Sequence, residues 1–200
     1  MIKAGIIGAS GYAGAEVVRL LLNHEDVEIV AISSQSYLGQ TFSSLYPSFY
    51  TIFDKEFVED NEVIDQCDVV FASLPHGLSE KYALECQKLN KKFIDLGADF
   101  RLDNEDDYKE WYRLDYHEKD LHLYSVYGLT EVNREKIKES QIIGNPGCYP
   151  TSITLGLYPL LKEKLNASTH IMIDSKSGTT GAGKSLSETT HFPKCNESFH

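Results

Sequence analysis

Residues 3–14 read Lys-Ala-Gly-Ile-Ile-Gly-Ala-Ser-Gly-Tyr-Ala-Gly, and this stretch decides the fold. The apolar run that ends at Gly8 predicts a buried strand, and the apolar residues from Val17 to Leu22 predict a helix. In a strand–turn–helix unit of this kind, glycines let the backbone approach a dinucleotide pyrophosphate at the helix N-terminus. The spacing is Gly-x-x-Gly-x-x-Gly rather than the usual Gly-x-Gly-x-x-Gly, so the interpretation depends on the position in the chain. A turn that only packs a helix on a strand is the alternative.

The residues after the second predicted strand, 27–33, bear on which dinucleotide would bind. An enzyme that uses NAD usually carries an acidic residue here, which holds the ribose hydroxyls. This chain has Ser33-Ser34-Gln35-Ser36, which lacks a charge that would repel a 2′-phosphate and offers hydroxyl donors to it. We therefore expect NADP rather than NAD, and a serine-rich loop without a ligand is the alternative. The expected cofactor contacts in these two loops are Gly8, Ser10, Gly11, Tyr12, Ala13, Gly14, Ser33, Ser34 and Ser36.

Two further predicted strands, 68–73 and 92–95, also end in loops with polar residues. Because ligands collect beyond the carboxyl ends of parallel strands, Pro75 and His76 are expected to line the cofactor site. A histidine that is satisfied within its own loop is the alternative. Arg101 could hold a substrate phosphate or carboxylate through a bidentate fork. An ion pair with Asp99 inside the loop is the alternative for this arginine.

Cys148 lies in the segment Asn145-Pro146-Gly147-Cys148-Tyr149-Pro150-Thr151, between a predicted strand at 141–144 and a predicted helix from Thr151 to about Leu165. The N–H groups at the start of a helix favour a thiolate, and a glycine beside the sulfur leaves room for a reactant. The pattern predicts an exposed, activated nucleophile. A buried structural cysteine is the alternative.

A second glycine-rich loop, Ser-Gly-Thr-Thr-Gly-Ala-Gly-Lys at 177–184, follows a predicted strand at 170–174. Such a loop can present backbone N–H groups and hydroxyls to an anion, with Lys184 as a point charge. It lacks the spacing of a P-loop, and a flexible linker is the alternative.

The remaining segments are assigned from periodicity and turn residues. They predict a long loop at 37–50, a strand at 51–58, helices at 60–66, 79–89 and 131–139, a peripheral helix at 104–116, a strand at 123–127 and an irregular tail at 187–200.

Composition excludes several classes of protein. A length of 200 residues suffices for one ordinary domain and part of a second. The net charge of −11 and the lack of a basic run argue against a nucleic-acid partner. Because no apolar stretch is long enough to span a membrane and no signal peptide is present, we expect a cytoplasmic protein with reduced thiols. The cysteines show no Cys-x-x-Cys spacing, and we expect no metal site.

Several motifs, spread in order along the chain, carry a family resemblance. They are G-A-S-G-Y-A-G-A-E at 8–16, S-L-P-H-G at 73–77, D-L-G-A-D-F-R-L at 95–102, V-Y-G-L at 126–129, N-P-G-C-Y-P-T at 145–151 and S-G-T-T-G-A-G-K at 177–184. The set resembles the N-acetyl-γ-glutamyl-phosphate reductases of arginine biosynthesis. Aspartate-semialdehyde dehydrogenases share the glycine loop and a catalytic cysteine but lack the motif around Cys148.

The resemblance implies an α/β fold with a Rossmann-type, mostly parallel sheet for binding NADP at 1–147. It implies that 148–200 begin a second, α+β domain for catalysis and dimerisation, and that the full-length protein is a homo-oligomer. It also implies Cys148 as the nucleophile, with the second glycine loop near cofactor and substrate. The expected site then includes Ser177, Gly178, Gly181, Ala182 and Gly183 for the cofactor, and Asn145 for the substrate together with Arg101 and Lys184.

Two departures from the family pattern affect these expectations. Family members often have arginine where this chain has Gln35. They also continue well past residue 200, into a His-rich stretch with the acid/base histidine, so the chain resembles a truncated reductase. The expected reaction is the NADPH-dependent reduction of N-acetylglutamyl 5-phosphate, a small molecule, to the 5-semialdehyde and phosphate through a cysteine thioester. An NADP-binding fragment without catalysis and a related aspartate-semialdehyde dehydrogenase are the alternatives.

Overall fold

The computed structural model describes residues 1–165, 170–185, 187–188 and 190–195. It divides the chain into two compact units, 1–145 and 146–200. In the described residues, none of the helices combines the length and apolar character that crossing a membrane requires.

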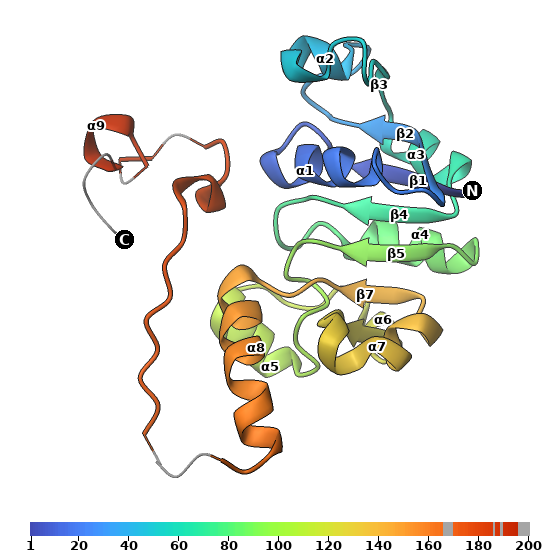
Figure 1. The fold of residues 1–200 in the computed structure, drawn as a ribbon. Coiled ribbons are helices and arrows are strands. Elements are labelled where there is room, and N and C mark those ends of the chain that lie inside the picture. Colours follow the sequence, from blue (N-terminus) through green and yellow to red (C-terminus); the bar gives the residue numbers. More distant parts are fainter. Residues whose placement is uncertain (166–169, 186, 189, 196–200) are drawn as a thin grey trace. The chain divides into compact units, whose positions relative to one another are not determined.

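The first unit is built on a sheet in which seven strands of the described chain pair in parallel (Figure 1). The chain leaves β1 toward β2 and later returns to β4 on the other side of β1, so the strand order reverses at β1. Ligands of open parallel sheets bind beyond the carboxyl ends of the strands at such a reversal. This arrangement confirms the predicted Rossmann-type sheet. In spatial order the strands are β3 (Phe57–Val58), β2 (Val27–Ser33), β1 (Ile2–Ile7), β4 (Val69–Ala72), β5 (Lys92–Asp95), β7 (Ile142–Gly144) and β6 (Ser125–Tyr127).

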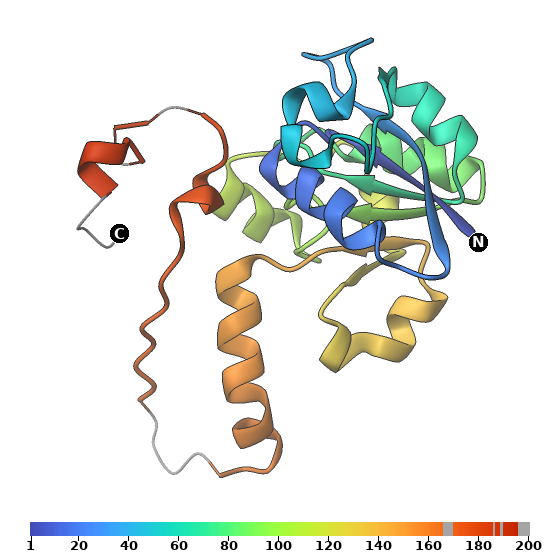
Figure 2. The same cartoon turned by 45° about the horizontal axis from the view of Figure 1, so that its top comes forward.

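Helices cover both faces of this sheet (Figures 1 and 2). Successive side chains of a strand point to opposite faces, so Ile6 and Ile7 of β1 enter different clusters. Ile6 packs with Val18 of α1, and Ile7 packs in the cluster that contains Val63 of α3 and Ala83 of α4. The main helices of this unit are α1 (Tyr12–Leu21), α3 (Asp60–Gln66), α4 (Glu80–Lys88), α5 (Glu105–Tyr112) and α7 (Thr130–Glu139), with the short α6 (Lys119–His122) after α5.

The predictions for 37–50 and 51–58 were wrong. The expected loop contains α2 (Phe42–Leu45) and the short 3-10 helix η1 (Pro47–Phe49), and the expected strand shrinks to β3. Phe42 is fully buried, and its ring lies 5.0 Å from the ring of Phe49 and 5.5 Å from that of Phe53. The aromatic side chains of this segment therefore pack on one another and join the cluster of Ile6 and Val18 on one face of the sheet. This packing requires compact turns rather than an extended strand.

The helix predicted at 104–116 exists as α5, but it is not peripheral on its inner side. Asn104 caps it, since its side-chain oxygen accepts hydrogen bonds from the backbone N–H groups of Asp106 and Asp107. Tyr108 is buried and forms a third cluster with Ala98 and Tyr116. The sequence pattern did not indicate this buried side, because most residues around Tyr108 are acidic or polar.

The second unit begins with α8 (Cys148–Lys162), which starts at Cys148 rather than at the predicted Thr151. No side chain of α8 is buried within the described part of the chain. Residues 170–174, predicted as a strand, pair with no strand that the structure describes. The 3-10 helix η2 (Thr179–Ala182) lies in the second glycine loop, and α9 (Phe192–Cys195) interrupts the tail predicted as irregular. Residues 196–200 of that tail lie outside the described residues.

Candidate active site

The first glycine loop is shaped by close backbone contacts. Gly8 has a φ of +78°, and a Cβ there would overlap the carbonyl group of Ser73 at the end of β4. A Cβ on Gly14 would lie 2.5 Å from the carbonyl oxygen of Gly8 and 2.7 Å from the Cα of Ala9. Gly11 is the N-cap of α1, and no cap side chain bonds to the first turn of the helix. The loop therefore combines tight packing with a helix N-terminus that carries a partial positive charge.

Two side chains from later in the chain hold this loop. The hydroxyl of Ser34 donates to the hydroxyl of Ser10 at 2.7 Å. The hydroxyl of Tyr46 donates to the carbonyl oxygens of Ser10 and Gly11, at 2.9 and 3.2 Å. The loops after β1 and β2, both predicted as cofactor contacts, thus lie together. Tyr46 was not predicted, because it comes from the segment that sequence reasoning treated as a loop.

The serines after β2 have different surroundings. Ser33 is fully buried, and its hydroxyl donates to the carboxylate of Asp60 at 2.5 Å, whereas Ser36 is exposed. Next to this end of β2 is a cavity of about 270 Å³ that includes two carboxylates from the start of α3. Its lining residues are Ser34, Gln35, Leu38, Val58, Glu59 and Asp60. Sequence reasoning found no carboxylate here because Glu59 and Asp60 follow β3 and reach this point only through the parallel pairing of β3 with β2.

His76 lies in the loop after β4, as predicted, and is exposed. Its ring is 5.3 Å from the ring of Tyr112 in an edge-to-face arrangement. Partial burial is the main cause that lowers the pKa of His76, and the charge of Arg101 lowers it further against an opposing effect of Asp99. A neutral imidazole is therefore favoured at neutral pH, at the carboxyl edge of the sheet where a cofactor would bind.

Arg101 connects the ends of two neighbouring strands. Its Nε donates to the carbonyl oxygen of Asn145 after β7 at 2.8 Å, and its Nη2 donates to the carbonyl oxygen of Leu96 after β5 at 3.0 Å. The Asn145 N–H in turn donates to the carbonyl oxygen of Asp95 at 2.7 Å. Arg101 thus holds the backbone at the predicted substrate residue Asn145. The carboxylate of Asp99, the alternative partner, accepts hydrogen bonds from Gly77, Ser79 and Tyr108.

In the second unit, Cys148 is exposed and is the first residue of α8. The N-cap of α8 is Gly147, which has no side chain to cover the first turn of the helix. Cys67 and Cys86 are buried, and desolvation raises the pKa of their thiols to about 11 and about 12. Cys195 is half-buried. Cys148 is therefore exposed at the start of a helix, and its role as a nucleophile stays a prediction.

The second glycine loop belongs to the same unit as Cys148. Gly183 has a φ of +79°, and the N–H of Gly181 donates to the carbonyl oxygen of Gly178 at 3.0 Å. Lys184 at its end is exposed. The loop is a tight turn with an exposed lysine after it, and anion binding by this loop stays a prediction. Its remaining predicted contacts are Ser177 and Ala182.

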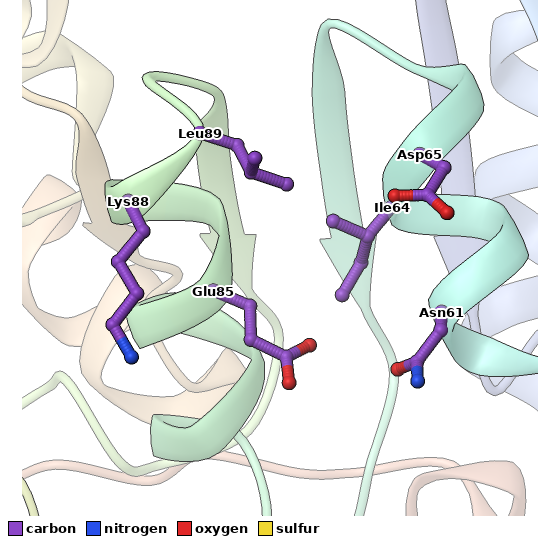
Figure 3. A pocket seen from close by; sticks show the side chains of 6 residues that line it. All are labelled: Asn61, Ile64, Asp65, Glu85, Lys88 and Leu89. Atoms are coloured by element: carbon purple, nitrogen blue, oxygen red, sulfur yellow. The ribbon is translucent and has the colours of Figure 1, made fainter.

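A further cavity of about 350 Å³ lies between α3 and α4 (Figure 3). Ile64 and Leu89 face each other across it, with Asn61, Asp65, Glu85 and Lys88 around them. It shares no lining residue with the predicted site.

Residues 3–140 match the family model described as semialdehyde dehydrogenase, NAD binding domain. The chain belongs to the semialdehyde dehydrogenase family. Residues 148–200 match the dimerisation domain of the same family, which confirms that a second domain begins in this chain.

Relatives within this family support the resemblance inferred from the motifs. N-acetyl-gamma-glutamyl-phosphate reductases are 55% identical to the chain over 199 residues in Clostridium botulinum (strain Eklund 17B / Type B) and 50% identical over 206 residues in Brachyspira hyodysenteriae. Both alignments cover 100% of this chain and 58% of the relative, so the chain spans little more than half the length of these proteins.

Solved semialdehyde dehydrogenases share the fold at low sequence identity. Aspartate semialdehyde dehydrogenase II from Vibrio cholerae, complexed with ASA, has a TM-score of 0.60 at 20% identity, covering 81% of this chain and 47% of that one. Aspartate semialdehyde dehydrogenase with NADP from Candida albicans has a TM-score of 0.57 at 20% identity, covering 82% and 47%.

Proposed function

We propose that this chain is the cofactor-binding domain and the nucleophile-bearing start of the second domain of an N-acetyl-γ-glutamyl-phosphate reductase. The observation that carries the proposal is identity of 50–55% to such reductases over the whole chain. In the proposed reaction, N-acetylglutamyl 5-phosphate is reduced to N-acetylglutamate 5-semialdehyde with release of phosphate. The domain description of the second family model supports a homo-oligomer for the full-length protein.

The residues of the first unit fit a bound dinucleotide. The contacts that a Cβ at Gly8 or Gly14 would make leave no space for a side chain inside the turn. This supports a turn whose backbone a pyrophosphate could approach at the N-terminus of α1. The exposed Ser36 supplies a hydroxyl after β2, and His76 lies beyond β4. Ser34 is buried, and its hydroxyl donates to Ser10 in the glycine loop. We assign NADP as the cofactor, since one solved neighbour is described with NADP. No carboxylate directly follows β2 in the sequence, and the carboxylates of Glu59 and Asp60 reach this end of β2 from the start of α3. When bound, NADPH would supply the hydride that reduces the acyl group.

Cys148 is assigned as the nucleophile. Its thiolate would attack the acyl carbon of the substrate, the bond from carbon to the phosphate oxygen would break, and phosphate would leave as a thioester forms. N–H groups in the first turn of α8 would stabilise the negative oxygen that develops during the attack. Lys184 and the loop of Ser177, Gly178 and Gly181 would neutralise the phosphate.

The test combines a binding measurement and a rate measurement on the same chain. NADPH is titrated by its fluorescence, and phosphate-dependent reduction of NADP is followed with N-acetylglutamate 5-semialdehyde. Cys148→Ala should abolish reduction and leave NADPH binding unchanged, while Cys195→Ala, the matched control, should change neither. Full activity of Cys148→Ala would refute the mechanism.

A second candidate function follows from the share of the relatives' length that the chain covers. A chain that binds NADPH without reducing any substrate would be a cofactor-binding fragment. If turnover occurs with aspartate semialdehyde and not with the N-acetylglutamyl substrate, the protein is an aspartate-semialdehyde dehydrogenase instead. A chain that does not bind NADPH at all would contradict the whole proposal.

A further inference from the structure

Two buried carboxylates lie beside the loop after β4. Asp95 is the last residue of β5 and Asp99 follows it, and both are fully buried. Asp95 accepts hydrogen bonds from the hydroxyl of Ser79 at 2.6 Å and from the N–H groups of Gly97 and Asp99 at 3.0 and 3.1 Å. A buried carboxylate is costly unless it is hydrogen-bonded, so the donors of these bonds show which segments each carboxylate holds in place. The bonds of Asp99 point away from its own loop.

Asp99 holds the turn that leads from β4 into α4. Its Oδ1 accepts from the N–H of Gly77 at 2.7 Å and from the hydroxyl of Tyr108 at 2.9 Å. Its Oδ2 accepts from the N–H of Ser79 at 2.8 Å. Ser79 is the N-cap of α4 and makes no side-chain cap bond, and Asp99 accepts from the backbone N–H of this N-cap residue rather than from those of the first turn. A negative charge at this helix end is also favoured by the helix dipole.

The other end of the same loop touches the glycine turn. The N–H of Ser73 donates to the carbonyl oxygen of Ile7 at 2.8 Å, and the Ser73 carbonyl lies against Gly8. Gly77 has a φ of +86°, with the side chain of Leu114 3.1 Å from its Cβ position. The loop that presents His76 is thus fixed to the glycine turn at its start and to Asp99 at its end.

We propose that Asp99 is a positioning residue, which places the loop of Pro75, His76 and Gly77 against the dinucleotide bound at the glycine turn. The inference rests on the proposed cofactor site. Asp99 acts through the backbone of Gly77 and Ser79 and does not itself contact the cofactor.

The bonding pattern explains why a carboxylate is needed here. Both oxygens of Asp99 accept from backbone N–H groups. An asparagine has one accepting oxygen, so its NH₂ group would face the N–H of either Gly77 or Ser79. Asp99→Asn should therefore release one of the two bonds and let the His76 loop move.

Glu80 provides a matched control at the same end of α4. It is buried, and its Oε1 bonds to the Nε2 of His122 at 2.8 Å. Its Oε2 accepts from the N–H groups of His117 and Glu118 at 2.6 and 2.9 Å. Glu80→Gln makes the same chemical change to a buried carboxylate, but it affects the segment at α6 and leaves the N–H groups of Gly77 and Ser79 bonded.

The experiment measures NADPH affinity and the position of His76 in this chain. Fluorescence titration should give a dissociation constant for Asp99→Asn that is about tenfold weaker than that of the wild type, as expected for one lost charge-assisted hydrogen bond. Glu80→Gln should stay within about twofold. Proton and carbon shifts of the His76 ring, which lies beside the ring of Tyr112, should change in Asp99→Asn and not in Glu80→Gln.

The outcomes separate this inference from the proposed function. If the wild type binds NADPH and folded Asp99→Asn binds it equally well with unchanged His76 shifts, the positioning role is refuted. If Asp99→Asn does not fold by circular dichroism, Tyr108→Phe decides, since it removes one donor to Asp99 and keeps the buried ring. Tyr108→Phe should weaken NADPH binding about threefold, and unchanged binding would overturn the inference. If the wild type does not bind NADPH, the cofactor site is refuted. The His76 shifts of Asp99→Asn then show only whether Asp99 holds the His76 loop in place.

Discussion

The contact between the glycine turn and β4 predicts that two chemically identical substitutions will have different effects. Gly8 and Gly39 both have left-handed backbone, with φ of +78° and +73°. A Cβ on Gly8 would overlap the carbonyl group of Ser73, whose carbon lies 3.0 Å away, whereas nothing lies within 4 Å of a Cβ on Gly39. Gly8→Ala therefore combines backbone strain with a clash, and Gly39→Ala has the strain alone.

The expected magnitudes follow from these two terms. A left-handed alanine costs about 1–2 kcal/mol, and the lower entropy of the unfolded chain offsets about 0.5 kcal/mol of this. Gly39→Ala should therefore lower the free energy of unfolding by about 1 kcal/mol. Overpacking against a backbone carbonyl adds about 1–3 kcal/mol, because a backbone group cannot rotate away as a side chain can. Gly8→Ala should thus lower the free energy of unfolding by about 2–4 kcal/mol.

Urea unfolding followed by far-ultraviolet circular dichroism measures both values, and NADPH fluorescence measures the consequence for binding. Gly8→Ala should weaken NADPH binding, since the displaced turn no longer presents its N–H groups, and Gly39→Ala should leave it unchanged. Equal destabilisation by the two substitutions would refute the argument that the turn is pressed against β4. Equal NADPH affinity of Gly8→Ala and the wild type would refute the assignment of the turn to the pyrophosphate.

The remaining predictions concern buried titratable groups. Burial alone would raise the pKa of Glu80, but its hydrogen bonds to His122 and to two backbone N–H groups lower it, so Glu80→Gln should cost about 2 kcal/mol in urea unfolding at neutral pH. That cost should shrink as the pH falls through the lowered pKa of Glu80, because the carboxylate is then protonated in the wild type. Desolvation raises the pKa of Asp95 to about 6. Its contribution to the free energy of unfolding should therefore fall as the pH rises from about 4 to 6. Asp95→Asn should lack this pH dependence when the free energy of unfolding is measured in urea. A thiol reagent at pH 8 should modify Cys148 in the native protein and reach Cys67 and Cys86 only in urea; their fast native reaction would contradict the core packing.

The parallel sheet could be predicted because each of its longer strands is a local run of apolar residues followed by a turn. That signal lies within one segment, and 27–33 and 92–95 were predicted with the bounds that the structure shows. The segment 37–58 could not be predicted in the same way. Its aromatic side chains pack on one another across compact turns, and such contacts leave neither a helical nor an alternating period in so short a stretch.

Sequence reasoning could name the loops of the candidate site but not the groups that hold them. Loops at the carboxyl ends of parallel strands follow directly from the strand assignment. Tyr46, Asp60 and Tyr108 hold these loops through contacts between segments far apart in the sequence. Nothing in the local pattern around these residues distinguishes them from surface residues, so the tertiary structure was needed to find them.

One distinction among the predicted contacts could have been made from the sequence. Ser33 and Ser34 were grouped as donors to a 2′-phosphate, but adjacent residues at a strand end point in opposite directions. The structure shows the consequence, since the hydroxyl of Ser33 bonds to Asp60 in the interior and that of Ser34 bonds to Ser10 in the glycine loop. Of these two hydroxyls, only that of Ser34 lies next to the expected path of the cofactor. Any contribution of Ser33 to NADP binding must therefore pass through the position of Asp60, whose carboxylate lines the cavity at this end of β2.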